Sequence, residues 1–341
     1  MQTQTLIDDY SHTDVTFLLG RTWEDDQVQA FIAGWEQLEW IDEEDLDKAR
    51  EDRRLSLMNE KLGLYLFFTD GASYRARYGR PRSSGDLILS RIACVFDYHP
   101  NWTPYNGELP LGLGAADTAA TTISRLGEPA RAWMAGPTLS KARWLTPEAI
   151  IDVSFVKATG GLKLVGLTPI PIASASPPQL SLPTPGYLAN LFGQSLATLQ
   201  RDPQLQVFDL GDKEAEIHRY REVDYSAELG MELYFKPGVE MVDAWPGAPR
   251  NGEFCLSGAR YRADMDFQSN GYTGPLPWGL DMEDTIDVVM HKAGLAPFKQ
   301  AIDDRDGYQR WRTEVGDVHV LYSFLEDRIY RVTLLARGCY D

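Results

Sequence analysis

The chain repeats one pattern of residues at a fixed offset of 167 positions. Residues 62–68 read LGLYLFF and return at 229–235 as LGMELYF, while 105–113 (YNGELPLGL) return at 272–280 as YTGPLPWGL. The match needs no gap from about residue 62 to 168. The recurring residues are glycines, prolines, aliphatics and tryptophans, which make turns and cores, whereas no catalytic set of His, Cys, Ser or acidic residues recurs. Self-similarity of this kind predicts a duplicated scaffold without a duplicated active site.

The length of 341 residues suits two domains, one for each copy. We predict a first repeat over 1–168, a linker over 169–186 and a second repeat over 187–341. The linker is rich in proline, which lacks a backbone N–H donor and disfavours helix. Extended polyproline geometry is therefore expected between the repeats.

Each copy is predicted to be an α+β unit. In the first copy, apolar and alternating runs predict strands over 64–68 and 87–98 and a terminal hairpin of strands 150–156 and 162–167. A helix of about ten residues is expected before Gly127, because glycine commonly follows a helix C-terminus. The second copy is expected to repeat these elements at the same offset. Hairpins combined with one or two helices predict a mainly antiparallel sheet that the helices cover on one face.

The composition is acidic, with 50 Asp and Glu against 33 Lys and Arg and a formal net charge of −17. Such a surface repels phosphates and anionic membranes and attracts cationic proteins, so neither nucleic acid nor a membrane is expected as a partner. Acidity that serves solubility alone is the competing interpretation. The N-terminal residues lack a signal-peptide pattern, and the three cysteines Cys94, Cys255 and Cys339 fit reduced thiols. A cytoplasmic protein is therefore expected.

No catalytic, cofactor or metal site is predicted. The five histidines lack zinc-protease spacing, and the chain has no Cys-x-x-Cys pair. Gly112 and Gly114 begin a dinucleotide-binding fingerprint whose third glycine is missing, which favours a tight turn before a capped helix. Trp144 and Trp311 occupy the same repeat position, each after an arginine. Burial in the core is favoured for both rings over a stacking platform for a sugar or base.

An acidic segment with interleaved aromatic residues lies upstream of residue 62, before the part of the first copy that repeats without a gap. No basic residue lies between Arg21 and Lys48. One interpretation is an amphipathic helix whose aromatic side faces the core. The other is a docking surface for a basic protein, with aromatic anchors among carboxylates. The candidate partner-binding residues are Trp23, Asp25, Asp26, Trp35, Glu39, Trp40, Glu43, Glu44, Asp45 and Asp47.

The order of these motifs resembles bacterial immunity proteins of contact-dependent and polymorphic toxin systems. The resemblance rests on LGLYLFF, LPLGL, the SRLGEP segment at 124–129 and an Arg-Trp pair before a hairpin, with partial matches in the second copy. It is greatest to type VI secretion immunity proteins that guard against restriction-endonuclease-like nuclease toxins. This resemblance implies a non-enzymatic cytoplasmic protein that binds and blocks a toxin, and it transfers no catalytic residue.

The expected function is therefore neutralisation of a basic toxin by steric and electrostatic occlusion. Nucleases need cationic grooves for phosphate, and an acidic inhibitor can occupy such a groove. Two alternatives stay open. One is a hydrolase that uses scattered carboxylates, since acid–base catalysis needs only two positioned Asp or Glu groups. The other is an acidic docking or regulatory scaffold for a different basic protein.

Overall fold

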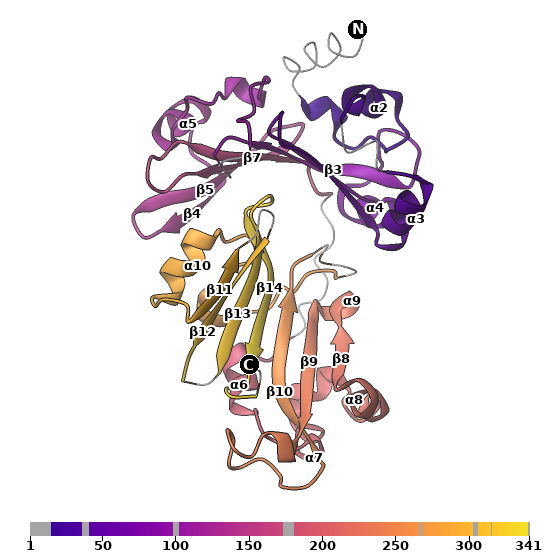
Figure 1. Ribbon diagram of the computed structural model, residues 1–341, viewed down its shortest axis with the longest axis vertical. Helices are drawn as coiled ribbons and strands as arrows, with labels where there is room; N and C mark the ends of the chain where they lie inside the picture. Colours follow the sequence, from indigo (N-terminus) through magenta and orange to yellow (C-terminus); the bar gives the residue numbers. More distant parts are fainter. Residues whose placement is uncertain are drawn as a thin grey trace. The chain divides into compact units, whose positions relative to one another are not determined.

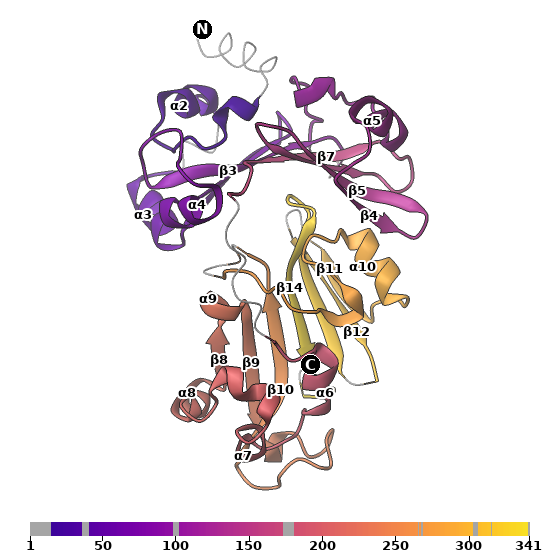
Figure 2. The same cartoon turned by 180° about the vertical axis from the view of Figure 1, so that it is seen from behind.

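The computed structural model describes residues 15–35, 41–97, 102–172, 181–264, 266, 269–302, 306–314 and 316–339. The chain divides into two compact units, Met1–Pro177 and Pro178–Asp341. The boundary falls inside the segment expected to be a linker. Each unit is built on one curved sheet with helices packed around it (Figures 1 and 2).

The N-terminal unit contains a seven-stranded antiparallel sheet in the order β1-β2-β3-β7-β6-β5-β4. Its strands are β1 (Arg54–Asn59), β2 (Leu64–Asp70), β3 (Leu87–Val95), β4 (Arg131–Ala135), β5 (Thr138–Leu145), β6 (Ile150–Phe155) and β7 (Leu162–Thr168). Its helices are η1 (Val15–Leu18), α2 (Asp26–Ile32), α3 (Glu43–Glu51), α4 (Gly71–Tyr78), η3 (Pro110–Gly112) and α5 (Ala119–Leu126).

The C-terminal unit has the same topology, with the strand order β8-β9-β10-β14-β13-β12-β11. Its strands are β8 (Glu222–Tyr225), β9 (Met231–Pro237), β10 (Phe254–Arg262), β11 (Lys299–Ile302), β12 (Asp306–Arg312), β13 (Asp317–Ser323) and β14 (Arg328–Leu335). Its helices are α6 (Pro185–Asn190), α7 (Leu196–Leu199), η4 (Pro203–Phe208), α8 (Glu214–Tyr220), α9 (Ser226–Leu229), η5 (Gly238–Glu240), η6 (Pro277–Gly279) and α10 (Ile286–Ala293).

The sequence repeat is a structural repeat. An offset of 167 superimposes the bounds of β2 on β9, β3 on β10, η3 on η6 and α5 on α10. The equivalence also reaches the start of each copy, because the Gly20 N–H donates to the Leu89 carbonyl and the Gly193 N–H donates to the Leu256 carbonyl. The prediction of two tandem α+β copies with mainly antiparallel sheets is confirmed.

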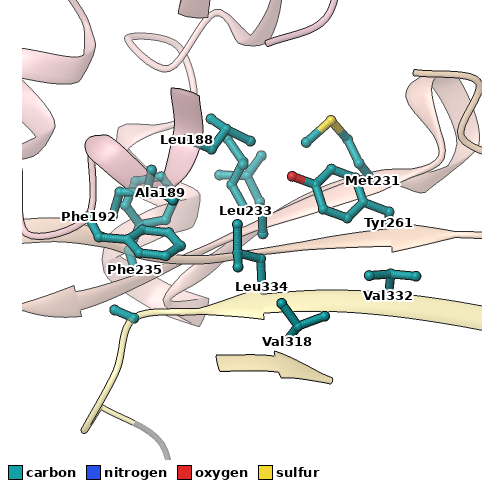
Figure 3. Packing of buried hydrophobic residues seen from close by; sticks show 14 of the residues in the cluster. Leu188, Ala189, Phe192, Met231, Leu233, Phe235, Tyr261, Val318, Val332 and Leu334 are labelled. Atoms are coloured by element: carbon teal, nitrogen blue, oxygen red, sulfur yellow. The ribbon is translucent and has the colours of Figure 1, made fainter. Parts of the chain in front are cut away.

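Each unit packs its hydrophobic core on one face of its sheet. In the C-terminal unit, Leu188 from α6 and Phe192 just after this helix pack on Leu233 and Phe235 of β9 and on Leu334 of β14 (Figure 3). The N-terminal unit has an equivalent cluster of buried residues that joins η1 and α2 to β2, β3, β6 and β7. Side chains alternate along a strand. The residues between these core positions therefore point to the other face, called here the opposite face of the sheet.

Several parts of the fold differ from the expectation. Strands β1, β4, β8 and β11 and helix α4 were not predicted, and β11 is exposed at all four residues and has no apolar alternation. The expected strand 87–98 ends at Val95. Helix α6 begins at Pro185, inside the expected linker. A proline in the first turn of a helix costs no hydrogen bond, and Thr184 caps this helix by accepting from the Tyr187 N–H at 3.2 Å.

Candidate interaction surfaces

Helix α3 forms because its N-terminus is capped and one side is apolar. The Asp45 N–H donates to Asp42 Oδ1 at 3.0 Å, and the Asp42 N–H donates to Asp45 Oδ2 at 3.3 Å. This reciprocal pair satisfies two backbone donors, and acidic residues in the first turn suit the helix dipole. Leu46 and Ala49 are buried, and the helix packs against the edge strand β1.

The outward side of α3 is a dense carboxylate surface. Residues 42–52 contain seven carboxylates and two basic residues. The side chains of Glu43 and Asp47 are 75% and 66% exposed, and both accept from the Arg50 guanidinium at 2.9 and 2.7 Å. Glu44 is also exposed. We call Glu43, Glu44 and Asp47 the acidic surface of α3.

The aromatic residues of the acidic segment do not belong to that surface. Trp23 and Trp35 are 9% and 3% exposed and lie in the hydrophobic core. The Trp23 ring meets Phe68 edge-on at 5.8 Å, and Trp35 packs on Phe31 at 6.0 Å. The prediction that these two tryptophans anchor a partner is therefore wrong. Trp35 lies beyond the end of α2 at Ile32, and both it and Phe31 face the core, as the alternative interpretation proposed.

The remaining candidates divide by location. Asp25 caps α2, where Oδ1 accepts from the Gln27 N–H at 2.9 Å and Oδ2 accepts from Arg21 at 3.1 Å. Partial burial works to raise the pKa of the Asp25 carboxyl, but hydrogen bonds from Gln27, Ser83 and Arg21 outweigh it and lower that pKa. Asp26 is exposed. Glu39 and Trp40 lie outside the described residues.

The C-terminal unit carries a counterpart of α3 with a different charge. Helix α8 packs against the edge strand β8 as α3 packs against β1. Each helix is followed by an arginine with positive φ, Arg53 (61°) and Arg221 (62°), whose guanidinium pairs with a carboxylate at 3.1 Å. Aligned on these arginines, residues 210–221 contain three Asp or Glu and three Lys or Arg residues, whereas residues 42–53 contain seven and three. The acidic helix surface is therefore a property of the first copy alone.

The two copies also differ on the opposite faces of their sheets. One row of cross-strand neighbours spans the second sheet from β11 to β8. It consists of Lys299, Arg310, His319, Thr333, Arg260, Glu232 and Asp224. The corresponding row of the first sheet, from β4 to β1, consists of Arg131, Arg143, Asp152, Gly166, Ala93, Tyr65 and Met58. The core positions recur between the copies, but most positions of this row do not.

The centre of the row shows the largest chemical change. In the first sheet, the Arg143 guanidinium donates to both oxygens of Asp152 at 2.6 and 2.8 Å. In the second sheet, Arg310 faces His319 instead, and it pairs with the carboxylate of Asp317 at 3.3 Å. Burial, followed by the charges of Arg310, Arg260, Lys299 and Arg331, lowers the pKa of His319 to about 4. The imidazole is therefore neutral at neutral pH and lies edge-on to Tyr308 at 5.0 Å.

The depressed pKa of His319 predicts how stability changes with pH. In the unfolded chain, His319 has a pKa of about 6.5 and is protonated below that pH. In the folded unit it is protonated only near pH 4. The C-terminal unit should therefore lose up to about 3 kcal/mol as the pH falls through this window. The His319→Gln variant should lose less. An NMR titration of the His319 ring that gave an ordinary pKa would contradict the prediction.

Sequence reasoning missed a carboxylate that does recur. Asp117 accepts from the Gly114 N–H at 2.8 Å and from Arg125 at 2.9 Å, and Arg125 also donates to the Gly112 carbonyl. In the second copy, Asp284 accepts from the Asp281 N–H at 2.8 Å and from Lys292 at 2.7 Å. Each carboxylate thus joins the turn of η3 or η6 to the following helix. The signal was present in the sequence, since both aspartates precede a basic residue by eight positions.

The paired tryptophans are core residues, as expected. Trp144 and Trp311 are 5% and 0% exposed. Each indole Nε1 donates to a backbone carbonyl at 3.0 Å, Gly127 for Trp144 and Leu295 for Trp311. Rings that are buried and hydrogen-bonded in this way offer no face to a ligand.

Within the described residues, no group of three or more His, Cys, Asp or Glu side chains is placed to hold a metal ion. None of the helices found there has the length and apolarity that a bilayer span requires. Comparisons with protein-family models, with curated protein sequences and with solved structures give no match for this chain.

Proposed function

We propose that this chain is an immunity protein that binds and neutralises a cationic toxin, with a nuclease as the expected class. The observation that carries the proposal is the acidic surface of α3. It presents exposed carboxylates on a helix whose counterpart α8 keeps the same place in the fold with balanced charge. The motif resemblance to immunity proteins supports the same function.

The proposed mechanism is electrostatic capture followed by steric blockade. Carboxylates clustered on one helix raise the rate at which a cationic protein meets this surface. A nuclease collects positive charge where it holds phosphate, so the groove that attracts nucleic acid also attracts α3. The buried residues Leu46 and Ala49 fix the helix on the sheet, so its carboxylates are ordered before the toxin arrives.

The direct test is to co-express the chain with the toxin encoded beside its gene. We expect survival of the host cells and a complex that can be purified. Cell death with no detectable complex would refute the immunity function. A complex with a basic protein that is not toxic would instead support the scaffold alternative, and substrate turnover by the purified chain would support the hydrolase.

Charge reversal on α3 should slow the association with the toxin. The Glu43→Lys/Glu44→Lys variant is expected to reduce the association rate about tenfold at low salt, and less at high salt where screening is strong. Stopped-flow or surface plasmon resonance would measure both rates. Asp45 is left intact, because it belongs to the reciprocal cap of the helix.

The chain provides a matched control on its other copy. Glu214 and Glu216 lie on α8, which occupies the equivalent edge of the second sheet. The Glu214→Lys/Glu216→Lys variant makes the same change in net charge, and its association rate should stay within about twofold of the wild type. Equal slowing by both variants would show that net charge acts, and not the acidic surface of α3.

A further inference from the structure

Strand β11 is an open edge of the second sheet. The strand order places β11 at one end and β8 at the other, and helix α8 packs against β8. All four residues of β11 are exposed, and its only paired strand among the described residues is β12. An edge strand presents unpaired backbone N–H and C=O groups that can pair with another chain.

Exposed apolar side chains concentrate beside this edge. Phe298 is 46% exposed, Ile302 is 60% exposed and Leu295 is 46% exposed. These three belong to a stretch of eight residues, yet they are three of the ten large exposed hydrophobic residues among the described residues. Exposed apolar residues that cluster in this way mark interaction surfaces, whereas single exposed apolar residues are normal on any protein surface.

The same edge is positively charged although the protein is acidic. The Arg312 guanidinium lies 4.5 Å from the centre of the Phe298 ring, and that of Arg310 lies 5.4 Å from it. Lys299 begins the strand and is exposed. Asp317 pairs with both arginines, at 3.3 Å from Arg310 and 3.8 Å from Arg312. The Arg312 side chain is still 59% exposed.

We propose that β11 is a docking edge for an extended, acidic segment of a partner protein, which adds to the second sheet as a further strand. Backbone pairing with β11 would supply affinity, as in other cases of strand addition. Alternate side chains of the guest segment would fall on the two faces of the sheet. Carboxylates on one face meet Lys299 and Arg312, and apolar residues on the other meet Ile302.

Charge decides between this occupant and a second copy of the chain. Pairing two β11 edges would bring Lys299 and Arg312 of one chain against the same cations of another. Like charges placed opposite each other across paired strands are destabilising. A foreign acidic segment avoids this local repulsion and places carboxylates beside Lys299 and Arg312.

Synthetic peptides can test the proposal on the full-length chain, independently of any toxin. The probe is a blocked peptide of alternating Glu and Val residues, and its binding is measured by fluorescence anisotropy. We expect the peptide with Lys in place of Glu to bind at least tenfold more weakly. A peptide with proline at its central position should also bind at least tenfold more weakly, because proline removes a ladder donor.

Protein variants locate the binding edge. Lys299→Glu and Arg312→Glu change exposed side chains and should each weaken binding of the Glu-Val peptide at least fivefold. Arg219→Glu is the matched control, because Arg219 is an exposed cation 5.0 Å from the Tyr220 ring beside the covered edge. Amide hydrogen exchange should slow in β11 when the peptide binds.

Several results would overturn the proposal. These are equal affinity for the Glu and Lys peptides, no binding of either peptide, and binding unaffected by Lys299→Glu and Arg312→Glu. The proposal would also be overturned if peptide binding slowed amide hydrogen exchange elsewhere in the chain and not in β11. Dimerisation of the chain through β11 without peptide would show that a second copy is the occupant.

Discussion

Replacing Trp311 with alanine should lower the free energy of unfolding of the C-terminal unit by about 3–5 kcal/mol. The side chain is fully buried and meets Trp278 edge-on at 5.5 Å. Its loss would leave a large cavity between β12 and η6, and would deprive the Leu295 carbonyl of the indole donor at 3.0 Å. Urea unfolding of the wild type and the variant would measure the difference.

A surface aromatic residue in the same unit provides the control. Tyr220 is 57% exposed at the end of α8, and Tyr220→Ala should change stability by less than about 0.5 kcal/mol. If Trp311→Ala cost no more than Tyr220→Ala, the ring would not be part of the core. The assignment of the repeated Arg-Trp position as structural would then fail.

Alanine at Gly230 should destabilise the C-terminal unit by about 2–4 kcal/mol, the sum of a left-handed backbone cost and an overpacking cost. Gly230 has φ of +68°, and a Cβ there would lie 2.2 Å from the Tyr272 backbone nitrogen. Backbone atoms cannot move aside as a flexible side chain can. Thermal and urea unfolding would measure the loss.

Gly294 separates the two costs. It has the same φ of +68°, but a Cβ there meets nothing within 4 Å. Gly294→Ala should therefore cost only about 1 kcal/mol, from the left-handed conformation alone. Equal losses at the two glycines would show that the close approach of residues 230 and 272 is absent. The first copy has the same contact, since a Cβ on Gly63 would lie 2.6 Å from the Tyr105 backbone nitrogen.

Much of the scaffold could be predicted, because the repeat preserves the residues that shape it. Gly63 and Gly230 hold equivalent close turns, and Gly127 and Gly294 end equivalent helices. The central strands contain runs of residues that are suited to burial, and each run predicts a strand from its own sequence. An example is β3, where all nine residues are buried. The outer strands β4 and β11 lack such runs, because an edge strand covers little of the core. Their hairpins were therefore missed.

The candidate surfaces were harder to predict, since they depend on which side of an element faces the sheet. The spacing of Phe31 and Trp35 predicts that the two rings share one side of the segment. It does not say whether that side faces the core or the solvent. The acidic residues of α3 were identified correctly as exposed. The pairing of His319 with Arg310 depends on cross-strand register, which local sequence does not contain.

The attachment of α3 to β1 leaves most of the helix surface free to vary. Only Leu46 and Ala49 of this short helix are buried, so the exposed side chains of Glu43, Glu44 and Asp47 are under little demand from folding. These carboxylates can be exchanged while the sheet beneath stays unaltered. Under the proposed immunity function, point substitutions on this one helix would follow a toxin whose surface changes, with no change of fold.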